Sequence, residues 1–225
     1  QDITIRHKFE ECIDIPPNVI RTIQVQLSPT HRKIYETMRR DAVLQLETGL
    51  LDSINKGVLR NKLLQIASGA VYDTDGNSQL IDTDRYELVL DLVQEVPHAL
   101  VAFNWRHQKE QLVIEAQRRG IRFAVIDGGT SQNDRNAAVK AMQAGELKAL
   151  FAHPQTTAHG LTLTTATRTI WPSPPANAEW YQQFNKRIYR AGQTKKTETI
   201  LISGQNTLEP LRYEQLEGKL QRMYN

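Results

Sequence analysis

Residues 99–103 read ALVAF, an apolar run that is too short for a helix and fits a buried strand. Residues 86–96 before it carry apolar side chains at helical spacing, and residues 106–119 after it are expected to form the next helix. The apolar run 123–126 then predicts a second strand. The chain therefore alternates between strand and helix on both sides of its centre.

The same alternation continues to the C-terminal end. The predicted elements are helix 132–143, strand 147–151, strand 169–171, helix 178–189, strand 199–202 and helix 209–223. Helix 132–143 carries a capping signal, because Ser131 is followed three residues later by Asp134. This spacing predicts an α/β fold, with a mainly parallel sheet covered by helices on both faces. Ligands of such sheets bind at the loops that follow the carboxyl ends of the strands.

The first eighty residues follow a different pattern. The Ser-Pro pair at residues 28–29 predicts the start of a helix, which has apolar side chains every four residues. A second helical stretch covers residues 58–67, and the turn-rich residues 73–77 close it. We therefore expect an N-terminal strand and a small helical segment over residues 1–80, followed by the main domain over 81–225.

Composition indicates an ordinary soluble globular chain. Of 225 residues, 40% are apolar and 24% charged, and no stretch approaches the roughly 18 apolar residues of a membrane span. Cys12 is the sole cysteine, which excludes an internal disulfide and fits a cytoplasmic location without a membrane. The chain begins with Gln1 rather than methionine, so we expect a piece of something longer. The net charge of +3 is small, but five basic residues and no acidic one lie within 186–196.

Several enzyme motifs are missing from the sequence. It contains no phosphate-binding Gly-x-x-x-x-Gly-Lys-Ser/Thr loop, no Asp-Glu pair, and no metalloprotease, serine-hydrolase or dinucleotide motif. Its six histidines lack the spacing of metal ligands, so no metal site is predicted. A complete active site is therefore not expected within this chain.

The segment 183–193 reads QFNKRIYRAGQ and carries the strongest chemical signal. On the predicted helix Arg187 and Arg190 share one face with Gln183 one turn earlier, and Gly192 ends the helix. Two guanidinium groups beside the rim of a parallel sheet can grip a polyanion such as a triphosphate. Surface arginines on a capped helix would show the same spacing, so spacing alone leaves both interpretations open.

This segment resembles motif VI of the Swi/Snf-type helicase-like ATPases of superfamily two, with Gln, Arg-x-x-Arg and Gly-Gln in order. Residues 100–105 look like motif IV, residues 126–130 like the Asp-Gly motif that follows it, and residues 153–163 like motif V. Residues 27–29 and 59–66 also resemble the segments that lead into this lobe. The resemblance covers nearly the whole chain and is nearest to compact phage and bacterial members.

The resemblance implies a second RecA-like lobe over residues 81–225, which is half of a two-lobe motor. The first lobe of that family carries the phosphate loop and the acidic pair that holds Mg²⁺. ATP and Mg²⁺ would thus be bound mainly through an N-terminal lobe of the same parent protein. Arg187 and Arg190 would be the arginine fingers, and Gln183, Gly160 and Leu161 would lie near the nucleotide.

The partner implied by the resemblance is duplex DNA, followed along its phosphates rather than read by base. The residues assigned to this rim are Trp105, Arg106, Gly128, Gly129, Thr130, His153, Gln155 and Thr156. Each also has a structural interpretation: Trp105 can cover the sheet edge, and the glycine pair can form a tight turn.

The sequence departs from the family pattern at three places. His153-Pro154 stands where many relatives have Ser-Thr, Thr162 replaces an asparagine, and Lys186 replaces an acidic residue. We expect the C-terminal half of an ATP-dependent DNA translocase or helicase-like ATPase, a hydrolase of ATP that is inactive when isolated. The alternatives are a non-catalytic module that binds nucleic acid or protein, and an RNA helicase lobe.

Overall fold

The computed structural model describes residues 15–47, 53–158 and 161–224. Its main feature is a six-stranded, wholly parallel sheet in the order β1-β8-β7-β4-β6-β5. The strands are β1 (Asn18–Val25), β4 (Ala99–Ala102), β5 (Phe123–Ile126), β6 (Ala149–Ala152), β7 (Arg168–Trp171) and β8 (Thr197–Gly204). The predicted parallel α/β fold is therefore confirmed.

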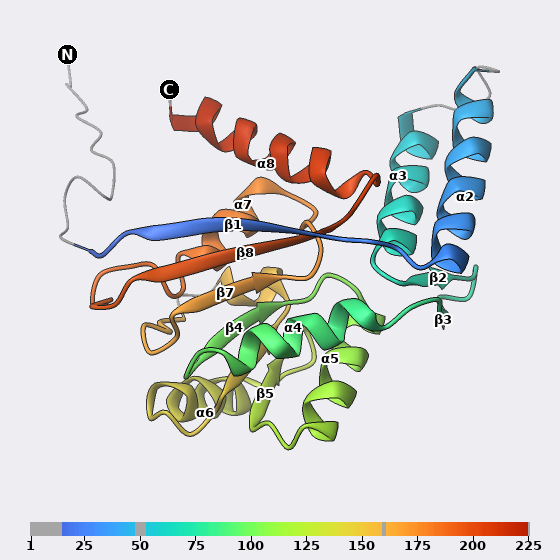
Figure 1. The fold of residues 1–225 in the computed structure, drawn as a ribbon. Coiled ribbons are helices and arrows are strands. Elements are labelled where there is room, and N and C mark those ends of the chain that lie inside the picture. The colour runs from blue at the N-terminus through green and yellow to red at the C-terminus, as the bar shows by residue number, and fades with distance from the viewer. Residues whose placement is uncertain (1–14, 48–52, 159–160, 225) are drawn as a thin grey trace, which may run out of the picture.

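Helices cover both faces of the sheet (Figure 1). They are α4 (Asp84–Gln94), α5 (Arg106–Arg118), α6 (Gln132–Gln143), α7 (Ala178–Asn185) and α8 (Glu209–Tyr224). Successive residues of β4 point to opposite faces, as the two-residue period of a strand requires. Val101 packs with residues of α4 and α5, whereas Leu100 and Ala102 pack with residues of α6, α7 and α8. Each face therefore has its own core.

Local signals account for the best-predicted elements. Strand 123–126 and helix 132–143 have the bounds that the sequence indicates. The Ser131 hydroxyl accepts a hydrogen bond from the Asp134 backbone N–H at 3.1 Å, so the predicted cap is present.

The helix expected over 178–189 was predicted too long. Helix α7 ends at Asn185, and the residues that follow form turns, so Gly192 lies in a later turn with φ +93° rather than at the helix end. Tertiary hydrogen bonds compete with helical ones here. The Leu163 N–H donates to the Arg187 carbonyl at 2.9 Å, and the Gln193 amide donates to the Ile188 carbonyl at 3.0 Å. The helical pattern ends before these residues, where the Arg187 N–H donates to the Phe184 carbonyl three positions back at 3.0 Å, and the two contacts then hold the turns that follow.

The first eighty residues form two parts. Strand β1 pairs with β8 over eight residues and forms one edge of the main sheet. Helices α2 (Pro29–Glu47) and α3 (Ser53–Ala67) pack together beside the sheet around a core that includes Tyr35 and Ile66 (Figure 1). A short hairpin of β2 (Ala70–Tyr72) and β3 (Ser78–Leu80) follows, which the sequence did not indicate. The division at residue 80 stays a prediction.

A buried ion pair lies where the helical segment meets the carboxyl end of the sheet. The Arg85 guanidinium, at the start of α4, donates to both carboxylate oxygens of Glu209 at 2.7 and 2.8 Å. It also donates to the carbonyls of Ala67 at 2.8 Å and Pro172 at 2.7 Å. This contact ties the end of α3 to the end of β7 and the start of α8. The Arg85 contacts and the His107 contacts, which are described in the next paragraph, are together called the junction.

His107 forms the second part of the junction. Its Nε2 lies 3.1 Å from the Ser68 hydroxyl and its Nδ1 lies 2.9 Å from the Tyr72 hydroxyl. Burial lowers the pKa of His107 to about 4, so the ring is neutral at pH 7.

In the described residues, no helix combines the length and apolarity that crossing a membrane demands.

Candidate functional site

Arg187 and Arg190 lie in the turns after α7, and both reach the same backbone atom. The Nη1 of Arg187 donates to the Leu161 carbonyl at 3.5 Å, and the Nη1 of Arg190 donates to the same carbonyl at 3.4 Å. Leu161 follows the short 3₁₀ helix η1 (Pro154–Ala158), which begins where β6 ends. The two arginines therefore converge although they do not share a helix face. We call them the arginine pair.

The arginine pair is poorly neutralised within the chain. Arg187 is only 8% exposed, and its Nε atom is buried without a hydrogen-bond partner in the described residues. Burial is the main cause that lowers the pKa of Arg187, and the nearby positive charge of Arg190 lowers it further. Among the residues that the structure describes, no carboxylate lies within ion-pair distance of either arginine. Since a buried unpaired charge is costly, this arrangement favours a bound anion.

The other predicted nucleotide residues are placed differently. Gln183 lies on α7, and its amide donates to Glu179 at 2.9 Å, so no hydrogen bond within the described residues joins it to the arginine pair. Leu161 contributes its carbonyl, while its side chain is part of the core. Gly160 lies outside the described residues.

Gln193 is a site residue that the sequence did not single out. Its amide nitrogen donates to the carbonyls of Thr164, Ala166 and Ile188 at 3.0–3.1 Å. These contacts fix the turn that carries the arginine pair against the segment after Leu161. Its position in the Gly-Gln of motif VI was the available signal, but only the fold shows what its side chain holds.

At the predicted rim, Asp127 organises the turn at residues 127–130. The Gly129 N–H donates to its carboxylate at 2.9 Å, and Lys109 Nζ lies 2.9 Å from its other oxygen. Lys109 holds the pKa of Asp127 below its ordinary value. Gly128 is exposed, and a Cβ there would meet nothing within 4 Å, so packing does not demand glycine at this position. The backbone of this turn faces solvent after the carboxyl end of β5.

His153 begins the next rim loop, after β6. Its ring packs edge-on against Phe103 and Trp180, each at a centroid distance of 5.8 Å, and burial lowers its pKa. The Thr156 hydroxyl donates to the His153 carbonyl at 2.7 Å, whereas Gln155 is exposed. Of these three predicted contacts, the Gln155 side chain is therefore the one displayed to solvent.

Trp105 and Arg106 follow β4 on the same side of the sheet. Trp105 is half-buried, and its Nε1 has no partner in the described residues. Arg106 is about half exposed; its Nη2 donates to the Gly76 carbonyl at 2.8 Å and its Nε lies 3.5 Å from Glu110. The predicted rim residues thus gather at the ends of β4, β5 and β6, while the arginine pair forms a separate group.

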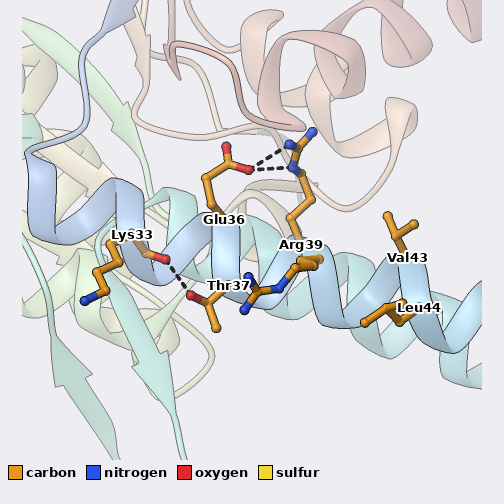
Figure 2. A pocket seen from close by; sticks show the side chains of 7 residues that line it. Lys33, Glu36, Thr37, Arg39, Val43 and Leu44 are labelled. Atoms are coloured by element: carbon orange, nitrogen blue, oxygen red, sulfur yellow. Dashed lines mark hydrogen bonds and ion pairs between the residues drawn. The ribbon is translucent and has the colours of Figure 1, made fainter.

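A hollow of about 680 Å³ lies elsewhere, on the outer side of α2 (Figure 2). Every residue that lines it comes from this one helix, and Glu36 is paired with Arg39 at 2.7 Å. One helix cannot enclose a ligand, and none of the predicted site residues lies there. In the described ranges, no group of three His, Cys, Asp or Glu side chains could hold a metal ion.

Known proteins resemble this chain in sequence. Residues 84–192 match the family described as the helicase conserved C-terminal domain. Protein p41 of Acyrthosiphon pisum secondary endosymbiont phage 1 is 26% identical over 97% of this chain, and the chain spans 47% of that protein. The SNF2 domain-containing protein ENL1 of Oryza sativa is 26% identical over 77% of the chain, which spans 18% of it.

Two solved structures share the fold. The C-terminal part of the Fun30 ATPase domain aligns with a TM-score of 0.71 and 16% identity, covering 89% of both chains. The Sulfolobus solfataricus SWI2/SNF2 ATPase core in complex with dsDNA aligns with a TM-score of 0.66 and 16% identity, covering 88% of this chain and 43% of the other. The chain thus spans half or less of the longer proteins that it resembles.

Proposed function

Because this chain carries the C-terminal RecA-like lobe of a Swi/Snf-type superfamily 2 helicase-like ATPase, we propose that it completes the ATP site of a DNA-dependent motor. The observation that carries the proposal is the arginine pair, in which two guanidinium groups share one carbonyl and have no carboxylate partner in the described part of the chain. A pure binding module would not need two such charges facing one point.

In this proposal the triphosphate of ATP, bound by an N-terminal lobe, supplies the missing anion. Arg190, half-buried, and Arg187, nearly buried, donate to its terminal phosphate oxygens. Charge develops on those oxygens during phosphoryl transfer, and forked guanidinium donors stabilise it. Mg²⁺ is held by the acidic pair of that other lobe. The isolated lobe therefore does not hydrolyse ATP.

Duplex DNA is the proposed partner of the rim. The exposed turn at Gly128, the Gln155 side chain and Arg106 all follow carboxyl ends of neighbouring strands. The Gly128 N–H, a side-chain amide and a guanidinium group suit phosphate oxygens and carry no base preference. A motor that moves along any sequence needs contacts of this kind. Closure of the two lobes around ATP would bring the arginine pair and the rim of this lobe against the other lobe.

The test is Arg190→Ala in the intact protein. We expect DNA-stimulated ATP hydrolysis to fall by roughly 10³–10⁵, as for other arginine fingers, while DNA affinity stays nearly unchanged. Arg122→Ala is the matched control, because Arg122 is exposed and precedes β5, at the amino ends of the strands and away from the rim. Unchanged hydrolysis in the Arg190 variant refutes the finger assignment. Stimulation by RNA in place of duplex DNA would instead identify an RNA helicase.

A further inference from the structure

A second basic surface lies next to the rim, in a groove of about 500 Å³. Three arginines from three different elements line it: Arg60 of α3, Arg106 of α5 and Arg212 of α8. No acidic side chain of the described residues lines this groove. We call it the arginine groove. From the sequence, residues 1–80 were interpreted only as a segment that precedes the main domain. Arg60 was therefore not among the predicted site residues.

The charges of the arginine groove are only partly compensated. Burial is the main cause that lowers the pKa of Arg212, and the positive charge of Arg60 lowers it further. The two guanidinium groups therefore repel each other. Arg212 donates to the Ala176 carbonyl, a neutral partner. Within the described ranges no ion pair involves Arg60 or Arg212, and the carboxylate nearest to Arg106 is that of Glu110 at 3.5 Å. The groove is therefore electropositive.

Apolar and aromatic side chains also line the groove, among them Trp105, Tyr72 and Pro174. Asn104 fastens the β4–α5 loop to the β7–α7 loop, because its side-chain amide donates to the Ser173 hydroxyl at 3.0 Å and to the Pro174 carbonyl at 3.2 Å. The groove is thus formed before any ligand arrives, which reduces the entropic cost of binding.

We propose that the arginine groove binds successive backbone phosphates of the same DNA strand that passes the rim, with the sugar against Trp105 and Pro174. The inference rests on the proposed function and extends it. Arg106 belongs to both surfaces, so a strand that leaves the rim at Arg106 enters the groove directly. Three guanidinium groups spread around 500 Å³ suit an extended phosphodiester chain better than one free phosphate. The helical segment and α8 would then take part in holding DNA.

The test is the salt dependence of duplex binding by the intact protein. Each phosphate neutralised contributes about 0.9 to the slope of log K against log salt. Arg60→Ala should therefore flatten the slope by about 0.9 for every duplex sequence, and Arg60→Ala with Arg212→Ala by about twice that. Arg60 is exposed, so its loss should not disturb folding. The control Arg122→Ala removes the same charge at the amino ends of the strands and should leave the slope unchanged.

The outcomes separate the groove from the motor. A wild-type slope in the Arg60 variant overturns the groove assignment and leaves the proposed function standing. Loss of affinity for inorganic tripolyphosphate with an unchanged DNA slope also overturns it, because the groove then binds a free phosphate compound. Absence of duplex binding by the wild-type protein removes the proposed DNA partner itself, and with it the groove assignment.

Discussion

The junction and the arginine pair place arginines in equally buried positions with opposite results. Arg85 is 6% exposed and Arg187 is 8% exposed. Arg85 meets both oxygens of Glu209 and two carbonyls at 2.7–2.8 Å, whereas Arg187 has one contact at 3.5 Å and a buried Nε without a partner in the described residues. Burial therefore does not identify a functional arginine. The hydrogen-bond and ion-pair partners of an arginine identify its role. A charge whose partners are present stabilises the fold, whereas a charge without partners can bind a ligand.

The largest effect on stability is expected from Arg85→Met, which tests this contrast most strongly. The substitution leaves the fully buried Glu209 carboxylate without its cation, so the free energy of unfolding should fall by about 3–5 kcal/mol. Urea denaturation measures it. The double variant Arg85→Met with Glu209→Gln should recover part of the loss, because no charge is then left buried. A loss below about 1 kcal/mol in the single variant would mean that the pair does not hold the junction.

An intermediate effect is expected from pH, through His107 of the junction. Its folded pKa of about 4 lies below the ordinary 6.5, so between these values the unfolded chain binds a proton that the folded chain does not. Stability should therefore fall as pH drops through this window, by about 3 kcal/mol in all. Urea unfolding at pH 7 and pH 4 measures the fall. His107→Gln should reduce it, and an equal pH dependence in that variant would contradict the assignment.

The smallest effect on stability is expected from Arg187→Met, the same substitution in the arginine pair. It removes a buried charge that has no carboxylate partner in the described residues and retains a stem that fills the space, so the change should stay within about 1 kcal/mol and can be favourable. Thermal or urea unfolding beside Arg85→Met gives the comparison directly. If both variants lose the same stability, the two arginines do not differ as the structure indicates.

Local signals were enough for much of the fold. The apolar runs at β4 and β5 and the cap at Ser131 were predicted from neighbouring residues alone, because strand length and capping are local properties. The end of α7 was not, since the turns after it are held by hydrogen bonds that Leu163 and Gln193 make to their carbonyls.

Prediction of the site from local sequence has the same limit. Arg187 and Arg190 were found because they are three residues apart, whereas Leu161 was placed near them only through the family resemblance, because spacing cannot connect residues 26 positions apart. Arg85 and Glu209 are separated by 124 positions, and Arg60 is brought to Arg212 only by the packing of α3 beside the sheet. Residue spacing within one segment reports on a helix or turn. It carries no information about which distant segments the sheet brings together.

Strand β1 has a consequence for any attempt to produce the lobe alone. It comes from before α2, yet it occupies the hydrogen-bonding edge of β8 over eight residues. A fragment that starts at residue 81 would leave that edge bare, and a long uncovered edge is a template for self-association. Residues 18–25 therefore belong in any fragment made to express the lobe, because a cut at residue 80 would expose this edge of β8.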